Sequence, residues 1–161
     1  MNKVTINRKS ESGTYKILEI FPGLHEEKVI LQIFETHEKI NHIFEKIRVI
    51  VDENSKYMHV DNNDASIIIG KNHLLSAEKI ILYLDIIHEL VHVKQQHQGL
   101  DLYDKSYSYV DRPTEIEAYK IAVNEAKRLG MKDKAIFDYL FVEWITDEEH
   151  KRLALVTGVS F

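Results

Sequence analysis

Apolar residues recur at three- and four-residue intervals along several long stretches of this chain, and this spacing places them on one face of an α-helix. The stretches are bounded by residues that start or stop helices, such as proline in a first turn or glycine just past the end. The pattern predicts five helices, over about residues 24–47, 77–98, 113–130, 132–144 and 147–156. The last of these is preceded by Thr146, with Glu149 three residues later, which is the spacing of a capping box.

Shorter segments that alternate between polar and apolar residues, or are rich in β-branched residues, are typical of β-strands. The first two are separated by a polar turn, so we expect them to form a hairpin. The strands are predicted at about residues 3–6, 15–20, 48–51, 57–60 and 65–69. Helices and strands together predict an α+β fold in which a small sheet follows the long first helix.

Length, charge and the short apolar runs exclude several classes of protein. The chain has 161 residues, of which 44% are hydrophobic, the size of one ordinary domain. Its formal net charge of −5 comes from 21 basic and 26 acidic residues mixed along the chain, so no basic surface for nucleic acid or anionic lipid is expected. No apolar run approaches the roughly 20 residues of a membrane helix, and the first ten residues lack the apolar core of a secretory signal. We therefore expect a cytoplasmic protein that binds neither nucleic acid nor membranes.

The five residues from His88 to His92 read HELVH and lie in the middle of the helix predicted over residues 77–98. One helical turn has about 3.6 residues, so the two histidines project from the same face and can bind one metal ion. Glu89 is rotated by about 100° from His88, where its carboxylate can reach a metal-bound water. The chain has no cysteine, so histidines and carboxylates would hold the metal. The motif therefore indicates a zinc-dependent hydrolase.

A catalytic zinc site needs three protein ligands and one open position, so a third ligand must come from elsewhere in the chain. Glu117 is our first choice, because it lies in the next predicted helix and the connection is long enough for the chain to reverse. Glu115 is the second choice. The longer motif HExxHxxGxxH is excluded, because positions 95 and 98 are both glutamine. The remaining candidates are His97, which lies about 140° from the two histidines around the helix, and Asp101, Asp104 and Asp111.

Two structural interpretations compete with this metal site. Thr114 and Glu117 have the spacing of a capping box, in which Glu117 would bond only to the backbone of Thr114. Alternatively, Asp111 caps the helix with Pro113 in its first turn, and Glu117 is then free to face the metal. The HELVH segment could also belong to an ordinary solvated helix, because a five-residue pattern with two variable positions recurs by chance.

These residues resemble the gluzincin-type zinc metallopeptidases, which pair HExxH with a glutamate on a later helix. The resemblance covers residues 67–129, and the sequence from Glu115 to Ala118 is similar to the small single-domain members, the minigluzincins and the proteins of ImmA/IrrE type. It implies one zincin-like α+β domain over residues 1–161. Within it we expect N-terminal strands and a backing helix, then the metal-site helices, then C-terminal helices, over residues 1–75, 76–130 and 131–161 respectively.

The activity that the resemblance implies is hydrolysis of a peptide bond, in which a zinc-activated water attacks the carbonyl group. By analogy, His88, His92 and Glu117 would bind one zinc ion per chain, and Glu89 would act as the general base. The strand at residues 65–69 resembles the edge strand that aligns a substrate by backbone pairing. The expected partner is therefore a peptide or protein substrate.

The chain departs from the larger gluzincins in its supporting residues. They carry an aspartate four residues after the glutamate ligand, where this chain has Ile121, so Asn124 or Asp111 would have to orient a histidine instead. No motif assigns the side chain that stabilises the transition state. The candidates for that role are Tyr107, Tyr109, Arg112 and His150.

Two other functions compete with a freely active peptidase. The enzyme would be latent if the segment over residues 141–157, in which Trp144, Ile145 and Thr146 form an apolar hinge between two helices, covers the cleft. The protein would be a regulatory or interaction module if HELVH is incidental or binds a metal only structurally. Structural zinc sites usually have four protein ligands and favour cysteine, which this chain lacks.

Overall fold

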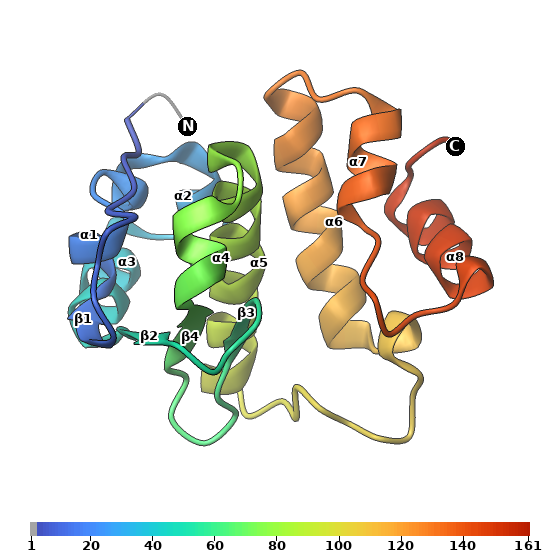
Figure 1. The fold of residues 1–161 in the computed structure, drawn as a ribbon. Helices are drawn as coiled ribbons and strands as arrows, with labels where there is room; N and C mark the ends of the chain where they lie inside the picture. The colour runs from blue at the N-terminus through green and yellow to red at the C-terminus, as the bar shows by residue number, and fades with distance from the viewer. Residues whose placement is uncertain (1–2) are drawn as a thin grey trace.

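The computed structural model describes residues 3–161 and shows two groups of helices that meet at the centre of the molecule (Figure 1). The N-terminal group surrounds a small sheet and ends with the central helix α5, Lys79–His97. The C-terminal group consists of α6, Pro113–Arg128, α7, Asp133–Tyr139, and α8, Asp147–Thr157. Helices α5 and α6 pack side by side where the two groups meet. The α+β class expected from the sequence is confirmed.

Four short strands form a mixed sheet in the N-terminal group. They are β1, Gly13–Lys16, β2, Arg48–Asp52, β3, Met58–Val60, and β4, Ile67–Gly70. Their spatial order is β1-β2-β4-β3, with β2 and β4 parallel and the two outer strands antiparallel to their neighbours. Strand β3 therefore lies at an edge, and the expectation that residues 65–69 form the edge strand is wrong, because β4 pairs on both sides.

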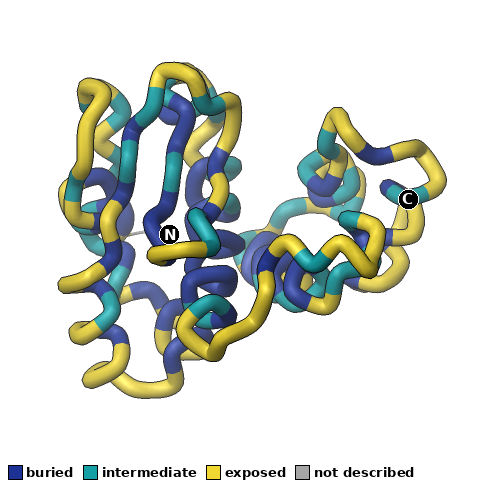
Figure 2. The backbone as a smooth tube through the Cα atoms, turned by 90° about the horizontal axis from the view of Figure 1, so that it is seen from below, coloured by how far each residue is buried: buried dark blue, intermediate teal, exposed yellow. Residues whose placement is uncertain are grey.

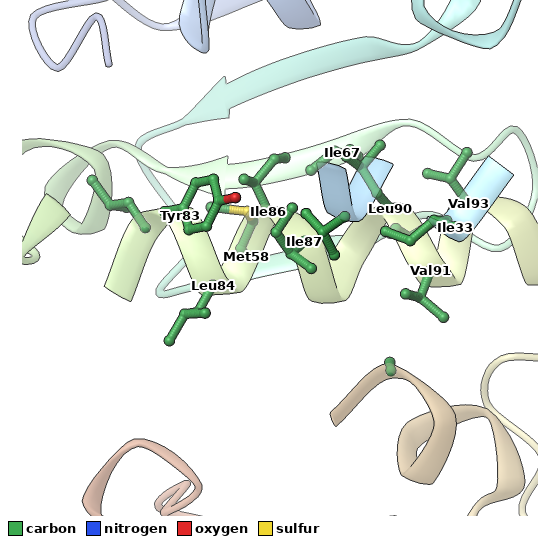
Figure 3. Packing of buried hydrophobic residues seen from close by; sticks show 14 of the residues in the cluster. Ile33, Met58, Ile67, Tyr83, Leu84, Ile86, Ile87, Leu90, Val91 and Val93 are labelled. Carbon is green, nitrogen blue, oxygen red and sulfur yellow. The ribbon is translucent and has the colours of Figure 1, made fainter. Parts of the chain in front are cut away.

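Helix α5 is buried on nearly all sides, because the sheet, α2 (Lys28–Phe34) and α6 all pack against it. Its apolar residues between positions 82 and 93 have no exposed surface. In Figure 3, Tyr83, Ile86 and Leu90 lie on the side of the sheet and α2, and Leu84 and Val91 point to the opposite side of the helix. Exposed backbone positions are found mainly on the outer loops and helix faces (Figure 2). Polar side chains in the middle of α5 are consequently buried too.

The single long helix predicted over residues 24–47 is wrong, because the structure has three short helices there. A 3₁₀ turn, η1 (Leu24–Glu26), precedes α2, and α3 spans His37–Lys46. Glu35 ends α2 with a φ of 71°, outside the helical region. Thr36 then caps α3 by accepting a hydrogen bond from the N–H of Lys39. Both helices bury their apolar faces, so the periodicity persists across the break.

The N-terminal hairpin predicted from residues 3–6 and 15–20 is also wrong. The first segment forms no strand, and its backbone bonds to a distant turn, for example from the Thr5 N–H to the Pro22 carbonyl. In the second segment, residues 15–20, the strand β1 ends at Lys16, and the helix α1 follows over Ile17–Ile20. Strand β1 pairs with β2 and not with residues 3–6.

The remaining predicted elements occur close to their expected positions, with two differences. Helix α7 ends at Tyr139 instead of residue 144, and an irregular segment leads from there to α8. Helix α4, Lys71–Ser76, was not expected from the sequence. The capping box of Thr146 and Glu149 at the start of α8 is confirmed. None of the helices in residues 3–161 is long and apolar enough to cross a membrane.

Candidate metal centre

The two histidines of the HELVH segment lie side by side on α5, and a carboxylate from α6 faces them. The Nε2 atoms of His88 and His92 are 2.9 Å apart. Oε2 of Glu115 lies 3.2 Å from Nε2 of His88 and 3.4 Å from Nε2 of His92. All three residues are buried. Two helices thus bring two imidazoles and one carboxylate into a compact cluster that could hold a metal ion.

The dimensions of this triangle suit a tetrahedral metal site. Zinc bound by histidine and carboxylate at about 2.0–2.2 Å would separate its ligand atoms by about 3.3–3.6 Å. The three observed separations, 2.9, 3.2 and 3.4 Å, lie at or just below this range. Oε2 of Glu115 is buried and contacts the two imidazole nitrogens, but no group among residues 3–161 forms a hydrogen bond with it, whereas buried polar atoms are normally hydrogen-bonded. Both observations show that the cluster fits a cation.

The carboxylate in this cluster belongs to Glu115, which corrects the prediction of Glu117 as the third ligand. Glu117 points to another side of α6, where its Oε1 accepts a hydrogen bond from Nζ of Lys94 at 2.6 Å. Its Oε2 accepts one from Nε2 of Gln95 at 2.8 Å, and the side chain is 42% exposed. The alternative capping box does not form either, because α6 begins at Pro113 with Arg112 as the N-cap residue.

The helical phase of α6 explains why Glu115 and not Glu117 faces the histidines. Residues three and seven positions apart share a face of a helix, and Glu115 shares its face with Ala118 and Ala122. Both alanines are fully buried against neighbouring elements. Glu117 is two positions from Glu115, which rotates it by about 200°. The two alanines were therefore a signal in the sequence for Glu115.

The four remaining candidates for a third ligand lie outside the cluster. Asp111 forms an ion pair with Arg152 on α8, and Oδ1 of Asp101 accepts hydrogen bonds from Asn62 and from the Tyr103 N–H. Asp104 accepts hydrogen bonds from Ser106. His97 is at the last turn of α5, on a different side of that helix.

The charges of the cluster perturb one another strongly. Burial alone would raise the pKa of the Glu115 carboxyl, but the two imidazoles lower it below its ordinary value. Burial would lower the pKa of His92, whereas Glu115, Glu89 and Gln95 raise it to about 9. The buried Glu115 carboxylate therefore stabilises positive charge between the two helices, as a metal ligand must.

The residues that surround the histidines differ from those expected. Asn124 is exposed and Asp111 faces α8, so neither orients a histidine. His92 is instead held through Nδ1 by Oε1 of Gln95, 2.7 Å away, which the sequence did not indicate. The position four residues after Glu115 is Tyr119, whose ring centroid lies 4.3 Å from that of His88. Nδ1 of His88 has no hydrogen-bond partner among residues 3–161.

Glu89 lies beside the cluster without belonging to it, and it faces a cavity of about 880 Å³. The residue is 6% exposed, and its Oε2 has no hydrogen-bond partner in the described chain. Burial raises the pKa of its carboxyl group. His88, His92 and Glu115 line the same cavity, so a molecule that enters it meets the base and the cluster together.

Three further segments contribute to the walls of this cavity, in addition to α5, α6 and His73 of α4. Residues 55–59 contribute the start of the edge strand β3, and residues 138–144 contribute the end of α7 and the segment after it. The loop after α5 contributes Leu102, Tyr103 and Tyr109. The cavity therefore lies between the two groups of helices, with α5 as its floor.

Of the four candidates for transition-state stabilisation, Tyr109 lines the cavity, and its hydroxyl lies 2.8 Å from that of Tyr119. Tyr107 and Arg112 are not among the lining residues, and Arg112 donates to the carbonyl of Asp104. His150 lies within 2.7 Å of the Phe137 carbonyl oxygen and stacks on the Phe137 ring. Tyr103, which also lines the cavity, was missed because no periodic pattern marks its loop.

No protein-family model matches this chain, and comparisons with curated proteins and with solved structures likewise find no match. The function must therefore be argued from the chemistry and geometry of the site.

Proposed function

We propose that the protein is a zinc-dependent peptidase in which His88, His92 and Glu115 hold one metal ion and Glu89 acts as the general base. The observation that carries this proposal is the position of the buried Glu89 in one cavity with a buried cluster of two imidazoles and a carboxylate. Metal-assisted hydrolysis requires a base and a metal site within reach of the same reacting group.

The donor set favours zinc over magnesium or calcium, which prefer oxygen ligands. Two imidazoles and one carboxylate form the three-ligand set of a catalytic zinc site, and a fourth position stays open for water or substrate. When bound, the ion would lower the pKa of water and polarise a carbonyl group. A structural zinc site would usually have four protein ligands, whereas this cluster offers three among the described residues.

Glu89 has the environment of a general base. Its burial raises the pKa of the carboxyl group, which makes the carboxylate a better acceptor for the proton of the attacking water. The protonated group can then pass that proton to the leaving amine, because an amine is a stronger base than a carboxylate. Its unpartnered oxygen Oε2 is available for these transfers. Glu89 would therefore supply the proton transfers, and a bound ion would keep its three ligands deprotonated.

The position of the sheet supports a peptide as the substrate. Strand β3 is an edge strand, and its residues Met58 and His59 line the cavity. The free backbone groups of an edge strand can pair with an extended peptide. The Val60 carbonyl at the end of this strand accepts a hydrogen bond from the Tyr103 hydroxyl at 2.5 Å. A peptide paired with β3 would therefore enter the cavity that Glu89 and the metal cluster line.

Among the candidates named from the sequence, Tyr109 is the one that lines the cavity, and we assign it as the donor for the negative charge that develops on the carbonyl oxygen. It lines the cavity, and burial raises the pKa of its hydroxyl group well above the ordinary value. The hydroxyl therefore stays protonated and can donate a hydrogen bond in the transition state. Its oxygen lies 2.8 Å from the hydroxyl oxygen of Tyr119, which also lines the cavity.

Hydrolysis by a variant with Glu89→Gln tests this mechanism. Glutamine keeps the shape of the side chain but cannot accept a proton, so we expect the rate to fall by about 10²- to 10⁴-fold with the metal content unchanged. The measurement uses a library of quenched fluorescent peptides and zinc-loaded protein. Glu78→Gln, at the exposed N-cap of the same helix, is the control and should leave the rate unchanged. Substantial activity of Glu89→Gln would contradict the mechanism.

A latent form of the same peptidase is the second candidate, because the segment over residues 141–144 connects two walls of the cavity. Nζ of Lys56 lies 2.5 Å from Oε1 of Glu143. The ring centroid of Trp144 lies 6.0 Å from that of Tyr57. Lys56 and Tyr57 precede the edge strand, so these contacts cross the route that a peptide would take along β3. Displacement of this segment would then regulate access to the site.

A further inference from the structure

The cavity that contains Glu89 extends along α5 to Asp85, one helical turn nearer the N-terminus. Oδ2 of Asp85 lies 2.7 Å from Nε2 of His73, and the side chain of Asp85 is 20% exposed. The hydroxyl group of Tyr139 also donates a hydrogen bond to this carboxylate. Within residues 3–161, no lysine or arginine forms an ion pair with Asp85. A carboxylate can accept about four hydrogen bonds, so Asp85 keeps accepting capacity toward the cavity.

The side chains around Asp85 suit a long, flexible cation. Ile81 lines the cavity one turn before Asp85, and the rings of Tyr57 and Tyr139 line it as well. The Tyr57 ring meets the His73 ring edge-on, with 5.7 Å between the centroids. Apolar and aromatic walls can cover the methylene groups of a lysine or arginine side chain, while a carboxylate binds its charged end.

The charge of the cavity as a whole also favours a cation. Five carboxylates line it, from Asp85, Glu89, Glu115, Asp138 and Glu143. The one lysine or arginine among its described lining residues, Lys56, is already paired with Glu143. Glu115 would be neutralised by a metal ion at the histidines, which leaves the region around Asp85 negative. A cavity in which carboxylates outnumber lysine and arginine favours a cationic group over an anionic one.

We propose that Asp85 determines specificity, by selecting a peptide that carries lysine or arginine next to the bond that is cleaved. This inference rests on the proposed peptidase function. Asp85 and Glu89 are four residues apart on α5, where side chains are neighbours with about 5–6 Å between Cβ atoms. A peptide residue whose carbonyl or amide faces Glu89 can therefore place a side chain of lysine length against Asp85. The unpartnered buried oxygen of Glu89 in the same cavity marks where the reacting group lies.

The test compares fluorescein-labelled octapeptides that differ at one central position, which is lysine, norleucine or glutamate. Norleucine has nearly the length of lysine without its charge. Zinc-loaded wild type should show a kcat/KM about 10- to 100-fold higher for lysine than for norleucine, as expected for a charged hydrogen bond. In Asp85→Asn, which can still accept a hydrogen bond from His73, this ratio should fall to about 1. In Asp85→Lys, the preference should move to the glutamate peptide. Asp147→Asn, an exposed carboxylate outside the cavity, should keep the wild-type ratio.

Binding of the same peptides separates this proposal from the peptidase proposal. Fluorescence anisotropy with zinc-loaded Glu89→Gln should show tighter binding of the lysine peptide than of the norleucine peptide, and Asp85→Asn in that background should remove the difference. If this binding preference is found while wild type cleaves no peptide, the specificity of Asp85 stands and the peptidase proposal fails. Equal affinities or equal kcat/KM values for lysine and norleucine, or a preference that survives Asp85→Asn, would overturn the assignment of Asp85.

Discussion

Oε1 of Gln95 accepts a hydrogen bond from Nδ1 of His92 at 2.7 Å, and this contact fixes which nitrogen of His92 faces Glu115. The amide of Gln95 is itself oriented, because its Nε2 group donates to the Thr114 carbonyl at 3.0 Å and to Glu117 at 2.8 Å. Oε1 must then be the atom that faces His92, so Nδ1 carries a proton, and Nε2 is the nitrogen that can bind a metal once its own proton is released. Glu117 thus supports the site through Gln95.

Replacing Gln95 by leucine should weaken metal binding without abolishing it. The change removes the acceptor that orients His92, and partners of this kind typically contribute 10- to 100-fold to metal affinity, so the Kd for zinc should rise by about that factor. Competition against a chelating fluorophore measures it. Gln96→Leu, the neighbouring residue outside the site, is the matched control. An unchanged Kd in Gln95→Leu would show that His92 needs no such support.

Replacing Trp144 by alanine should increase peptide hydrolysis if the segment over residues 141–144 restricts access. Trp144 contacts the rings of Tyr57 and Tyr109, with centroid distances of 6.0 and 5.6 Å. An aromatic contact contributes about 0.5–1.5 kcal/mol, so its loss should raise kcat/KM by about 2- to 12-fold. Tyr107→Ala removes an exposed aromatic ring that does not line the cavity and should have no effect. A lower kcat/KM in Trp144→Ala would mean that the tryptophan belongs to the substrate pocket and restricts nothing.

Replacing Gly70 by alanine should both destabilise the fold and disturb the cavity wall. A Cβ at this position would lie 2.3 Å from the carbonyl oxygen of Ser55, so the segment that begins at Ser55 must shift. Overpacking of this kind costs about 1–3 kcal/mol, which urea unfolding can measure, and KM for peptides should rise because residues 55–59 line the cavity.

Gly130→Ala is the control for the glycine experiment. Its φ of +84° carries a backbone cost of about 1–2 kcal/mol, but an added Cβ would meet no atom within 4 Å. We therefore expect lower stability with an unchanged KM. Equal KM values for Gly70→Ala and wild type would show that the approach of Ser55 to Gly70 does not shape the cavity.

The pairing of two histidines on one face of α5 was predictable from the sequence, because the geometry of a helix alone determines which of its residues share a face. His88 and His92 are four residues apart, so they share a face of α5 whatever packs around that helix. In the structure their Nε2 atoms are 2.9 Å apart. The break at Glu35 was not predictable in the same way, because the apolar period continues through it and the positive φ carries no signature in a glutamate side chain. Periodicity reports which residues are buried, not whether the backbone between them is continuous.

The third residue of the cluster required a contact between two helices, and this is where the prediction failed. Glu115 and Glu117 lie at nearly the same separation from His92 along the sequence. Only the rotational phase of α6 decides which of the two carboxylates faces the histidines. The buried Ala118 and Ala122 reveal that phase, because they pack against neighbouring elements on the side of Glu115. The prediction that residues 65–69 form an edge strand failed for a related reason. The order of strands depends on tertiary pairing that no local pattern encodes.

The central claim is that His88, His92 and Glu115 bind one metal ion, and elemental analysis of the purified protein tests it most directly. Wild type, Glu115→Ala and Glu117→Ala are each incubated with zinc, freed of excess metal and checked for folding by circular dichroism. We predict about one zinc per chain in wild type and in Glu117→Ala, and loss of zinc in folded Glu115→Ala. No zinc in wild type, or zinc that is lost with Glu117 and retained without Glu115, would contradict the account.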